Sequence, residues 1–208
     1  MNGRVKTLHT KIHAGILSNR DKRSHQTILK KLNFYEIDFV IVNFYPFEKT
    51  LNYTKNHNQI IKNIDIGGPA MVRSASKNYK YVTVITNSMQ YDELIHELNK
   101  NKGSTTLNFR KRMCEIAFAE TGYYDSLIAN YFNKISNNKF PKKKLIHGNL
   151  IENLRYGENP HQDSAIYSME QDLNILLLNG KKLSYNNYND IFSALLISKS
   201  LPKNTGTV

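Results

Sequence analysis

Two short apolar segments, each flanked by sequences typical of helices, constrain the fold of this chain more than any other feature. Residues 37–42 read Ile-Asp-Phe-Val-Ile-Val, and residues 81–86 read Tyr-Val-Thr-Val-Ile-Thr. Both are rich in β-branched side chains and have the length of a buried strand. The segments expected to be helical alternate with them, at residues 21–32, 58–63, 69–78 and 89–98. This alternation predicts an α/β fold with a mostly parallel sheet.

The pattern becomes wholly helical after residue 104. Apolar side chains recur at spacings of three and four, which predicts a helix over residues 104–135 with Gly122 as a candidate break. Beyond it we expect a strand at residues 175–178 and a final helix over residues 188–201.

A polar, basic and proline-containing segment, residues 136–144, is the best candidate for a domain boundary. We therefore expect one domain over residues 1–140 and a second over residues 141–208. The second is short for an independent hydrophobic core, and it is expected to be cut short.

Composition narrows the class of protein. The single cysteine, Cys114, excludes an internal disulfide framework and favours a reducing, cytoplasmic compartment. No run approaches the ~20 apolar residues of a membrane helix, so no membrane partner is expected. The net charge of +12 is weak support for nucleic-acid binding, because 22 of the 29 basic residues are lysines and 26 asparagines accompany them, as biased coding would produce.

The amino-terminal corner places Arg4, Lys6 and Thr7 within four residues, which suits the binding of an anion. A solvated basic terminus is the alternative. His9 and His13 have the spacing of metal ligands on a helix, but no acidic ligand lies between them, and no metal site is predicted.

Asn43 and Tyr45 follow the first expected strand, at the edge where ligands of parallel sheets bind. Tyr45 could equally cover the core with its hydroxyl in water.

The segment Ile64-Asp65-Ile66-Gly67-Gly68-Pro69 combines a carboxylate, two glycines and a helix start that favours anions. Lys77 lies eight residues beyond Pro69, so a carboxylate and an ammonium could bracket a substrate. An ordinary turn in which Asp65 caps the helix is the alternative.

In the second segment, Arg155 and Tyr156 open the string RYGENPHQ, which the residues alone identify only as a loop with a guanidinium and an aromatic face.

Five strings in matching order resemble the family of bifunctional purine biosynthesis proteins that join IMP cyclohydrolase to phosphoribosylaminoimidazolecarboxamide (AICAR) formyltransferase. They are GRVKTLH with HAGIL, NFYPF, IDIGGPAMVRSASKN, RYGENPHQ and NGKKLSYNN. Thr10 stands where the family usually has a proline.

The resemblance implies a methylglyoxal-synthase-like cyclohydrolase domain, N-terminally truncated, followed by the start of a cytidine-deaminase-like α/β formyltransferase domain. It assigns catalysis to Lys6, Tyr45, Asp65 and Lys77. The residues that it implies for substrate binding are Arg4, Thr7, Asn43 and Gly67 in the first domain and Arg155 and Tyr156 in the second.

The resemblance further implies AICAR, formyl-AICAR and IMP as substrates or products, and 10-formyltetrahydrofolate as co-substrate of the intact family with no bound cofactor. It implies a homodimer at full length, and no nucleic-acid partner. The phosphate-binding segments expected before Met1 and the Lys-His segment expected after Val208 are not in this sequence, so we expect an internal fragment with little activity of its own. A basic nucleic-acid-binding module and a non-functional gene remnant are the alternatives.

Overall fold

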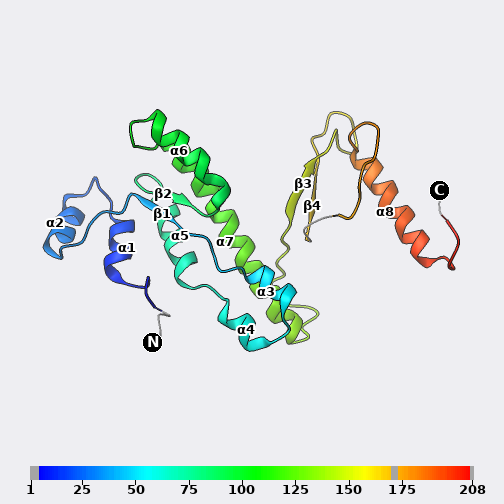
Figure 1. Cartoon of the computed structure of the whole chain (residues 1–208), viewed down its shortest axis with the longest axis horizontal. Coiled ribbons are helices and arrows are strands. Elements are labelled where there is room, and N and C mark those ends of the chain that lie inside the picture. Colours follow the sequence, from blue (N-terminus) through cyan, green and yellow to red (C-terminus); the bar gives the residue numbers. More distant parts are fainter. Residues whose placement is uncertain (1–4, 170–172, 207–208) are drawn as a thin grey trace. The chain divides into compact units, whose positions relative to one another are not determined.

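The computed structural model describes residues 5–169 and 173–206, and it divides the chain into two compact units, residues 1–145 and 146–208 (Figure 1). The elements of the first unit are α1 (Thr10–Leu17), α2 (Arg23–Lys31), β1 (Phe39–Ile41), α3 (Phe47–Tyr53), α4 (His57–Lys62), α5 (Gly67–Lys77), β2 (Thr83–Ile85), the 3₁₀ turn η1 (Ser88–Gln90), α6 (Tyr91–Lys100) and α7 (Leu107–Ile135). The mixed α/β class predicted from the sequence is confirmed.

The two strands of the first unit form a small parallel sheet, as predicted. Val40 pairs with Val84, and Ile41 pairs with Ile85. The ladder continues beyond the strands, where the Val42 N–H donates to the Ile85 carbonyl at 2.9 Å. Because the strands are parallel, their carboxyl ends meet at one edge of the sheet.

Burial differs between the two strands, and the prediction of a buried strand holds for β2 but only for Val40 in β1. All three residues of β2 are buried beneath α5 and α7, whereas Phe39 and Ile41 of β1 are 36% and 49% exposed. Within the described residues β1 has a strand on one edge only. Apolar side chains that lack a covering layer on one side remain in contact with solvent.

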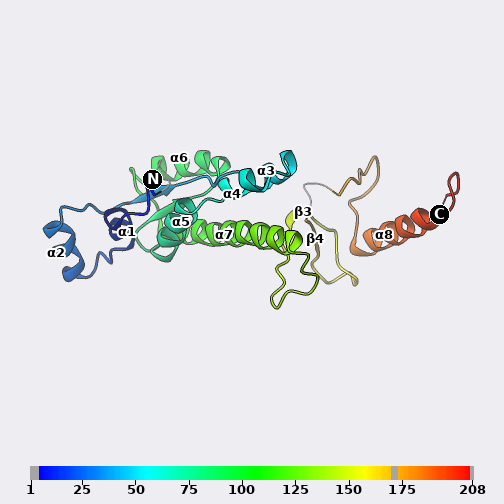
Figure 2. The ribbon, with the colours of Figure 1, turned by 90° about the horizontal axis from the view of Figure 1, so that it is seen from below.

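The long helix α7 carries much of the core of the first unit. Phe109, Met113 and Ala117 recur every four residues and pack on the sheet and α5, while Tyr124 joins a second apolar cluster around Phe47. α5 and α7 lie side by side in Figure 2.

The candidate break at Gly122 is not present, because α7 runs without interruption from Leu107 to Ile135. Apart from its chain neighbours and the backbone of its own helix, no atom lies within 4 Å of the position that a Cβ of Gly122 would occupy. A glycine inside a helix costs only about 1 kcal/mol relative to alanine, and packing on both sides of the position offsets this.

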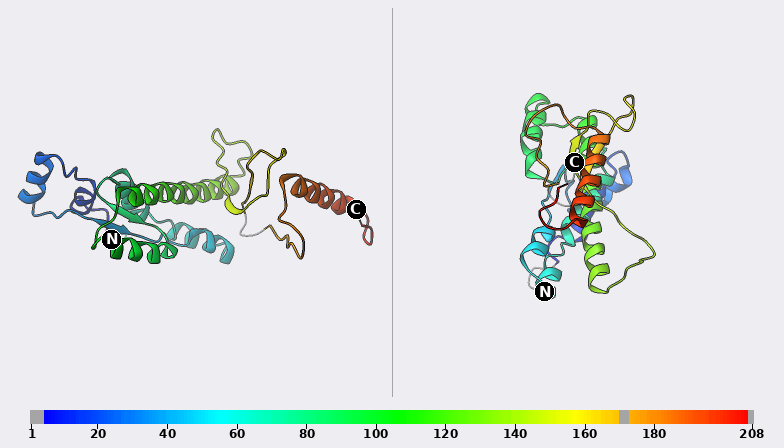
Figure 3. Two further views of the ribbon diagram at one scale, coloured as in Figure 1. Left: turned by 90° about the horizontal axis from the view of Figure 1, so that it is seen from above. Right: turned by 90° about the vertical axis from the view of Figure 1, so that its right-hand side faces the viewer.

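The second unit contains β3 (Asn149–Asn153), β4 (Ala165–Ser168) and α8 (Tyr185–Ser200). β3 and β4 form an antiparallel pair (Figure 1). α8, drawn in orange to red in Figure 3, confirms the expected final helix. The predicted strand at residues 175–178 is wrong: the segment is irregular, and Leu176 and Leu178 are 79% and 87% exposed. An apolar run becomes a strand only where another strand accepts its hydrogen bonds.

Four elements had not been predicted, namely α1, α3, β3 and β4. α1 and α3 are short, with 8 and 7 residues, and the two strands of the hairpin are short as well, with 5 and 4 residues. Short segments give weak periodicity, so their conformation depends on what they pack against. No helix in the described part of the chain is long and apolar enough to span a lipid bilayer.

Candidate functional site

The amino-terminal corner contacts the start of α5. Thr7 is half-buried, and its hydroxyl oxygen lies so close to Gly67 that a Cβ on Gly67 would overlap it. Lys6, one residue earlier, is exposed. Arg4 lies outside the described residues. A glycine at position 67 therefore permits two segments sixty residues apart to meet.

The turn before α5 is held by hydrogen bonds on both sides of Asp65. One carboxylate oxygen, Oδ1, accepts from the Gly68 N–H at 2.9 Å, as the capping alternative requires. The Asp65 N–H donates to the Tyr124 hydroxyl at 2.8 Å. A Cβ on Gly68 would overlap the carboxylate of Asp65, so both glycines allow the turn to close tightly.

A cavity of about 370 Å³ lies at the carboxyl ends of the two parallel strands. Its lining includes Asn43 and Tyr45 after β1, Thr86 and Asn87 after β2, and Glu120 and Tyr124 from α7. This is the edge at which open parallel sheets bind ligands. Tyr45 is 55% exposed, so its phenol is accessible from solvent.

The sequence pattern did not single out Glu120 and Tyr124 as site residues. They lie four residues apart on α7 and therefore on one face of the helix. This spacing is the sequence signal that could have identified them together. Burial raises the pKa of the Glu120 carboxyl, and the negative charge of Glu48 raises it further. Glu48 in turn accepts a hydrogen bond from the Tyr123 hydroxyl at 3.1 Å.

Lys77 is not brought next to Asp65 within one chain. α5 begins at Gly67 and ends at Lys77, so the two residues lie at opposite ends of the helix. Ten residues of helix rise about 15 Å, and Lys77 is exposed at the far end. The structure thus brings Thr7, Gly67 and Asp65 together. Tyr124 bonds Asp65 and also lines the cavity that contains Asn43 and Tyr45. Lys77 lies apart from this group.

In the second unit, Arg155 and Tyr156 contact each other. The Arg155 guanidinium lies 4.9 Å from the Tyr156 ring centroid, and its Nη2 donates to the phenol oxygen at 3.3 Å. Their backbone is fixed to the segment before α8, because the Arg155 N–H donates to the Leu183 carbonyl and the Tyr185 N–H to the Tyr156 carbonyl, each at 3.2 Å. Two motifs of the sequence, RYGENPHQ and NGKKLSYNN, thus meet here.

The two histidines with metal-ligand spacing make other contacts. His9 caps α1 by accepting from the Lys11 N–H, and the His13 ring bonds Ser74 Oγ at 3.1 Å. Among the described residues no three His, Cys, Asp or Glu side chains gather as a metal site would require.

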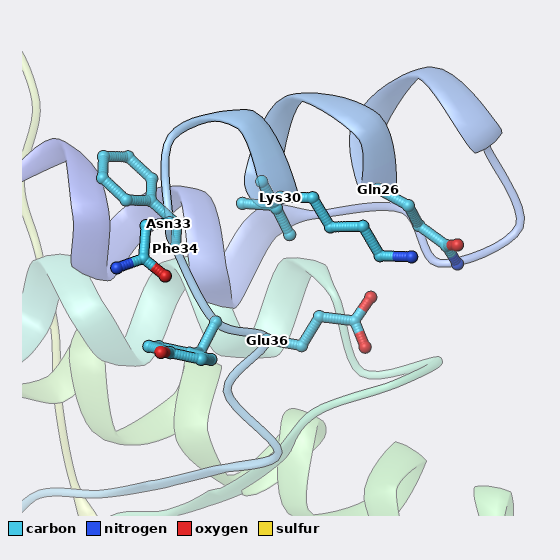
Figure 4. A pocket seen from close by; sticks show the side chains of 7 residues that line it. Gln26, Lys30, Asn33, Phe34 and Glu36 are labelled. Carbon is cyan, nitrogen blue, oxygen red and sulfur yellow. The ribbon is translucent and has the colours of Figure 1, made fainter.

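A second hollow, of about 480 Å³, lies at the carboxyl end of α2 (Figure 4). Gln26 and Lys30 project into it from α2, and Asn33, Phe34 and Glu36 come from the loop that follows. None of the site residues predicted from the sequence lines this hollow, so it is separate from the candidate site.

Comparison with known proteins gives a consistent result. The family model described as AICARFT/IMPCHase bienzyme matches residues 75–208. The bifunctional purine biosynthesis protein PurH of Rhizobium rhizogenes is 44% identical over 209 residues, which cover 98% of this chain and 39% of that protein. The protein of the same name from Clostridioides difficile is 44% identical over 203 residues, covering 96% and 39%.

Among solved structures, the one titled "Crystal structure of ForH" is similar, with a TM-score of 0.56 and 29% identity. The match covers 64% of this chain and 69% of that one. The chain spans about 39% of the length of the curated relatives named above.

Proposed function

This chain belongs to the AICARFT/IMPCHase bienzyme family, and we propose that it carries most of an IMP cyclohydrolase site together with the beginning of an AICAR formyltransferase. In this proposal residues 1–140 form the cyclohydrolase domain, with a methylglyoxal-synthase-like fold. Residues 141–208 contain the linker and the start of a cytidine-deaminase-like domain. The substrates are AICAR and formyl-AICAR, the product is IMP, and 10-formyltetrahydrofolate supplies the formyl group.

One observation carries the proposal, namely the approach of Thr7 to Gly67 beside Asp65. It joins the two strings that the family resemblance marks as the cyclohydrolase site. The Thr7 hydroxyl and the nearby ammonium of Lys6 favour a substrate with anionic and carbonyl oxygens.

Ring closure requires a weakly nucleophilic carboxamide nitrogen to attack a formamide carbon. The attack creates an oxyanion, and loss of water then completes the ring. Lys6 and Tyr45 would donate hydrogen bonds to that oxyanion, which is where preorganised donors contribute most. Thr7, Asn43, Gly67 and, by the resemblance, Arg4 would hold the substrate.

Asp65 would take the proton from the attacking nitrogen and Lys77 would supply one to the leaving hydroxyl. Because about 15 Å of helix separates the two residues, direct transfer between them within one chain is ruled out. The proposal therefore has Lys77 acting in the site of a second copy, which agrees with the homodimer that the family resemblance implies.

In the second unit, Arg155 and Tyr156 would contact AICAR. Their mutual contact already orders the guanidinium above an aromatic ring. Such an arrangement suits a planar substrate with a carboxamide or phosphate oxygen.

Binding of IMP to the chain, measured by calorimetry or by amide chemical-shift changes, tests the cyclohydrolase proposal. Gly67→Ala should weaken IMP binding at least tenfold, because the new Cβ displaces Thr7. Gly122→Ala is the matched control, since its Cβ would meet no atom outside its own helix backbone and chain neighbours, and it should leave affinity unchanged. Equal IMP affinity in both variants, or preferential binding of an oligonucleotide, would overturn the proposal.

A further inference from the structure

We propose that Tyr124 is a positioning residue of the candidate site, and that its hydroxyl fixes the Asp65 turn relative to the segment that carries Asn43 and Tyr45. The role of the site itself rests on the function proposed above, whereas the positioning is a property of this chain that can be measured without any substrate.

The Tyr124 hydroxyl contacts the Asp65 turn twice. It accepts a hydrogen bond from the Asp65 N–H at 2.8 Å, and it donates one to the Asn63 carbonyl at 3.2 Å. A single hydroxyl thereby pairs a backbone donor and a backbone acceptor that lie two residues apart. Other restraints on the turn are local, among them the bonds from the Gly68 N–H to the Asp65 carboxylate and from the Ile64 N–H to the Ile61 carbonyl.

The ring of Tyr124 contacts the other half of the site. Its centroid lies 5.1 Å from that of Phe44 and 6.1 Å from that of Phe47, the residues that flank Tyr45 and Pro46. Tyr124 also lines the cavity shared by Asn43 and Tyr45. The side chain is 5% exposed, so neighbouring groups restrict its rotamer.

A single long helix carries both sets of contacts. Tyr124 lies well inside the 29-residue helix α7, which the sheet and α5 support along one face. The segment before α5 and the segment after β1 both contact Tyr124. The position of α7 therefore sets the distance between these two segments. A site built from loops requires this kind of support to hold its groups in place.

The protonation state of the phenol agrees with this role. Burial raises the pKa of Tyr124, the hydrogen bond from Asp65 lowers it, and the charges of Asp65 and Asp125 raise it again. The phenol therefore keeps its proton at neutral pH and can donate it to the Asn63 carbonyl.

Amide hydrogen exchange in the Tyr124→Phe variant tests the positioning. The phenyl ring keeps the contacts with Phe44 and Phe47, so the unit should fold, while the Asp65 N–H loses its acceptor. We expect exchange at Asp65 about tenfold faster than in the wild type, with a smaller increase at Gly68. The buried Val84 amide reports global opening and should change far less.

Tyr131→Phe is the matched control, because it removes a hydroxyl that lies about two turns further along the same helix and bonds His57 Nδ1 at 2.7 Å instead of Asp65. It should leave exchange at Asp65 at the wild-type rate. Unchanged exchange at Asp65 in Tyr124→Phe, or equal acceleration at Asp65 and Val84, would contradict the proposal.

IMP binding then connects the positioning to function. If the wild-type chain binds IMP, Tyr124→Phe should weaken binding several-fold and Tyr131→Phe should not. An unchanged affinity in Tyr124→Phe would overturn the positioning role. If the wild-type chain does not bind IMP, the proposed function fails for this chain, and the exchange measurement alone decides the inference about Tyr124.

Discussion

The two units of this chain differ in what holds their secondary structure together. In the first, Phe47, Ile16 and Met113 are each only 1% exposed. Ile16 and Met113 belong to a cluster that joins helices to the sheet, and Phe47 belongs to a second cluster that joins α3, α4 and α7. Among the described residues of the second unit, Tyr188 is the one large hydrophobic residue that is buried. Leu196 and Ile197 of α8 are 71% and 53% exposed.

This difference shows that capping residues and backbone hydrogen bonds are enough to form a helix or a strand pair, but do not by themselves bury its apolar side chains. α8 begins with a reciprocal capping box between Ser184 and Asn187, and β3 and β4 pair through backbone hydrogen bonds. None of these interactions removes much apolar surface from water, which is the dominant favourable term in folding. We therefore expect the two units to respond very differently to side-chain truncation.

The largest expected effect comes from Met113→Ala in the first unit. Removing a fully buried side chain leaves a cavity beside the sheet and should lower the free energy of unfolding by about 2–5 kcal/mol. Leu196→Ala in α8 should change it by less than about 0.5 kcal/mol, because that side chain is already exposed. Urea unfolding monitored by segment-resolved hydrogen exchange measures both changes in the free energy of unfolding. Equal losses of stability in the two variants would contradict the distinction between the units.

An intermediate effect is expected from Tyr188→Phe, which removes a side-chain hydrogen bond between α8 and β3. The Tyr188 hydroxyl donates to Glu152 Oε1 at 2.6 Å, and hydrogen bonds to charged groups contribute about 1.5–3 kcal/mol. Exchange in β3 and β4 should accelerate, while that of the first unit should not. Tyr185→Phe, at the exposed start of α8, serves as the control.

The same bond gives the second unit a pH dependence. Burial, and then the hydrogen bond and charge of Glu152, raise the pKa of Tyr188 to about 12. Since the folded-state pKa lies above the usual value of about 10, the stabilisation is complete below pH 10 and is lost as the pH rises toward about 12. Protection of β3 that stayed constant across this range would contradict this expectation.

The smallest effect is expected from Glu120→Gln, in the cavity of the first unit. Because burial and Glu48 raise the pKa of Glu120, its ionisation destabilises the fold as the pH rises through that pKa. Replacing the carboxyl should stabilise the first unit at pH 7 by about 0.5 kcal/mol, after allowance for solvent screening, and leave it unchanged at pH 3. Thermal unfolding at the two pH values measures the difference, and a benefit that persisted at pH 3 would exclude ionisation as its cause.

Much of the fold was predictable because the signals are local. Both parallel strands, the helix after Pro69, the long helix that ends at Ile135 and the final helix follow from apolar periodicity and breaker residues. The strand at residues 175–178 was wrong because a strand requires a partner, and no apolar run specifies one. The exposure of Phe39 and Ile41 escaped prediction because they share one face of β1, and a strand sequence does not specify which helices will cover that face.

For the candidate site, the sequence by itself determined the chemistry of the groups: a hydroxyl at Thr7, an amide at Asn43, a phenol at Tyr45 and a carboxylate at Asp65. Tertiary structure alone decided their grouping, through the approach of Thr7 to Gly67, the bonds of Tyr124 and the separation of Lys77 along α5. The reason is physical, since residue type and short spacings encode local conformation and acid-base character, whereas distances across the fold depend on which helix faces pack together.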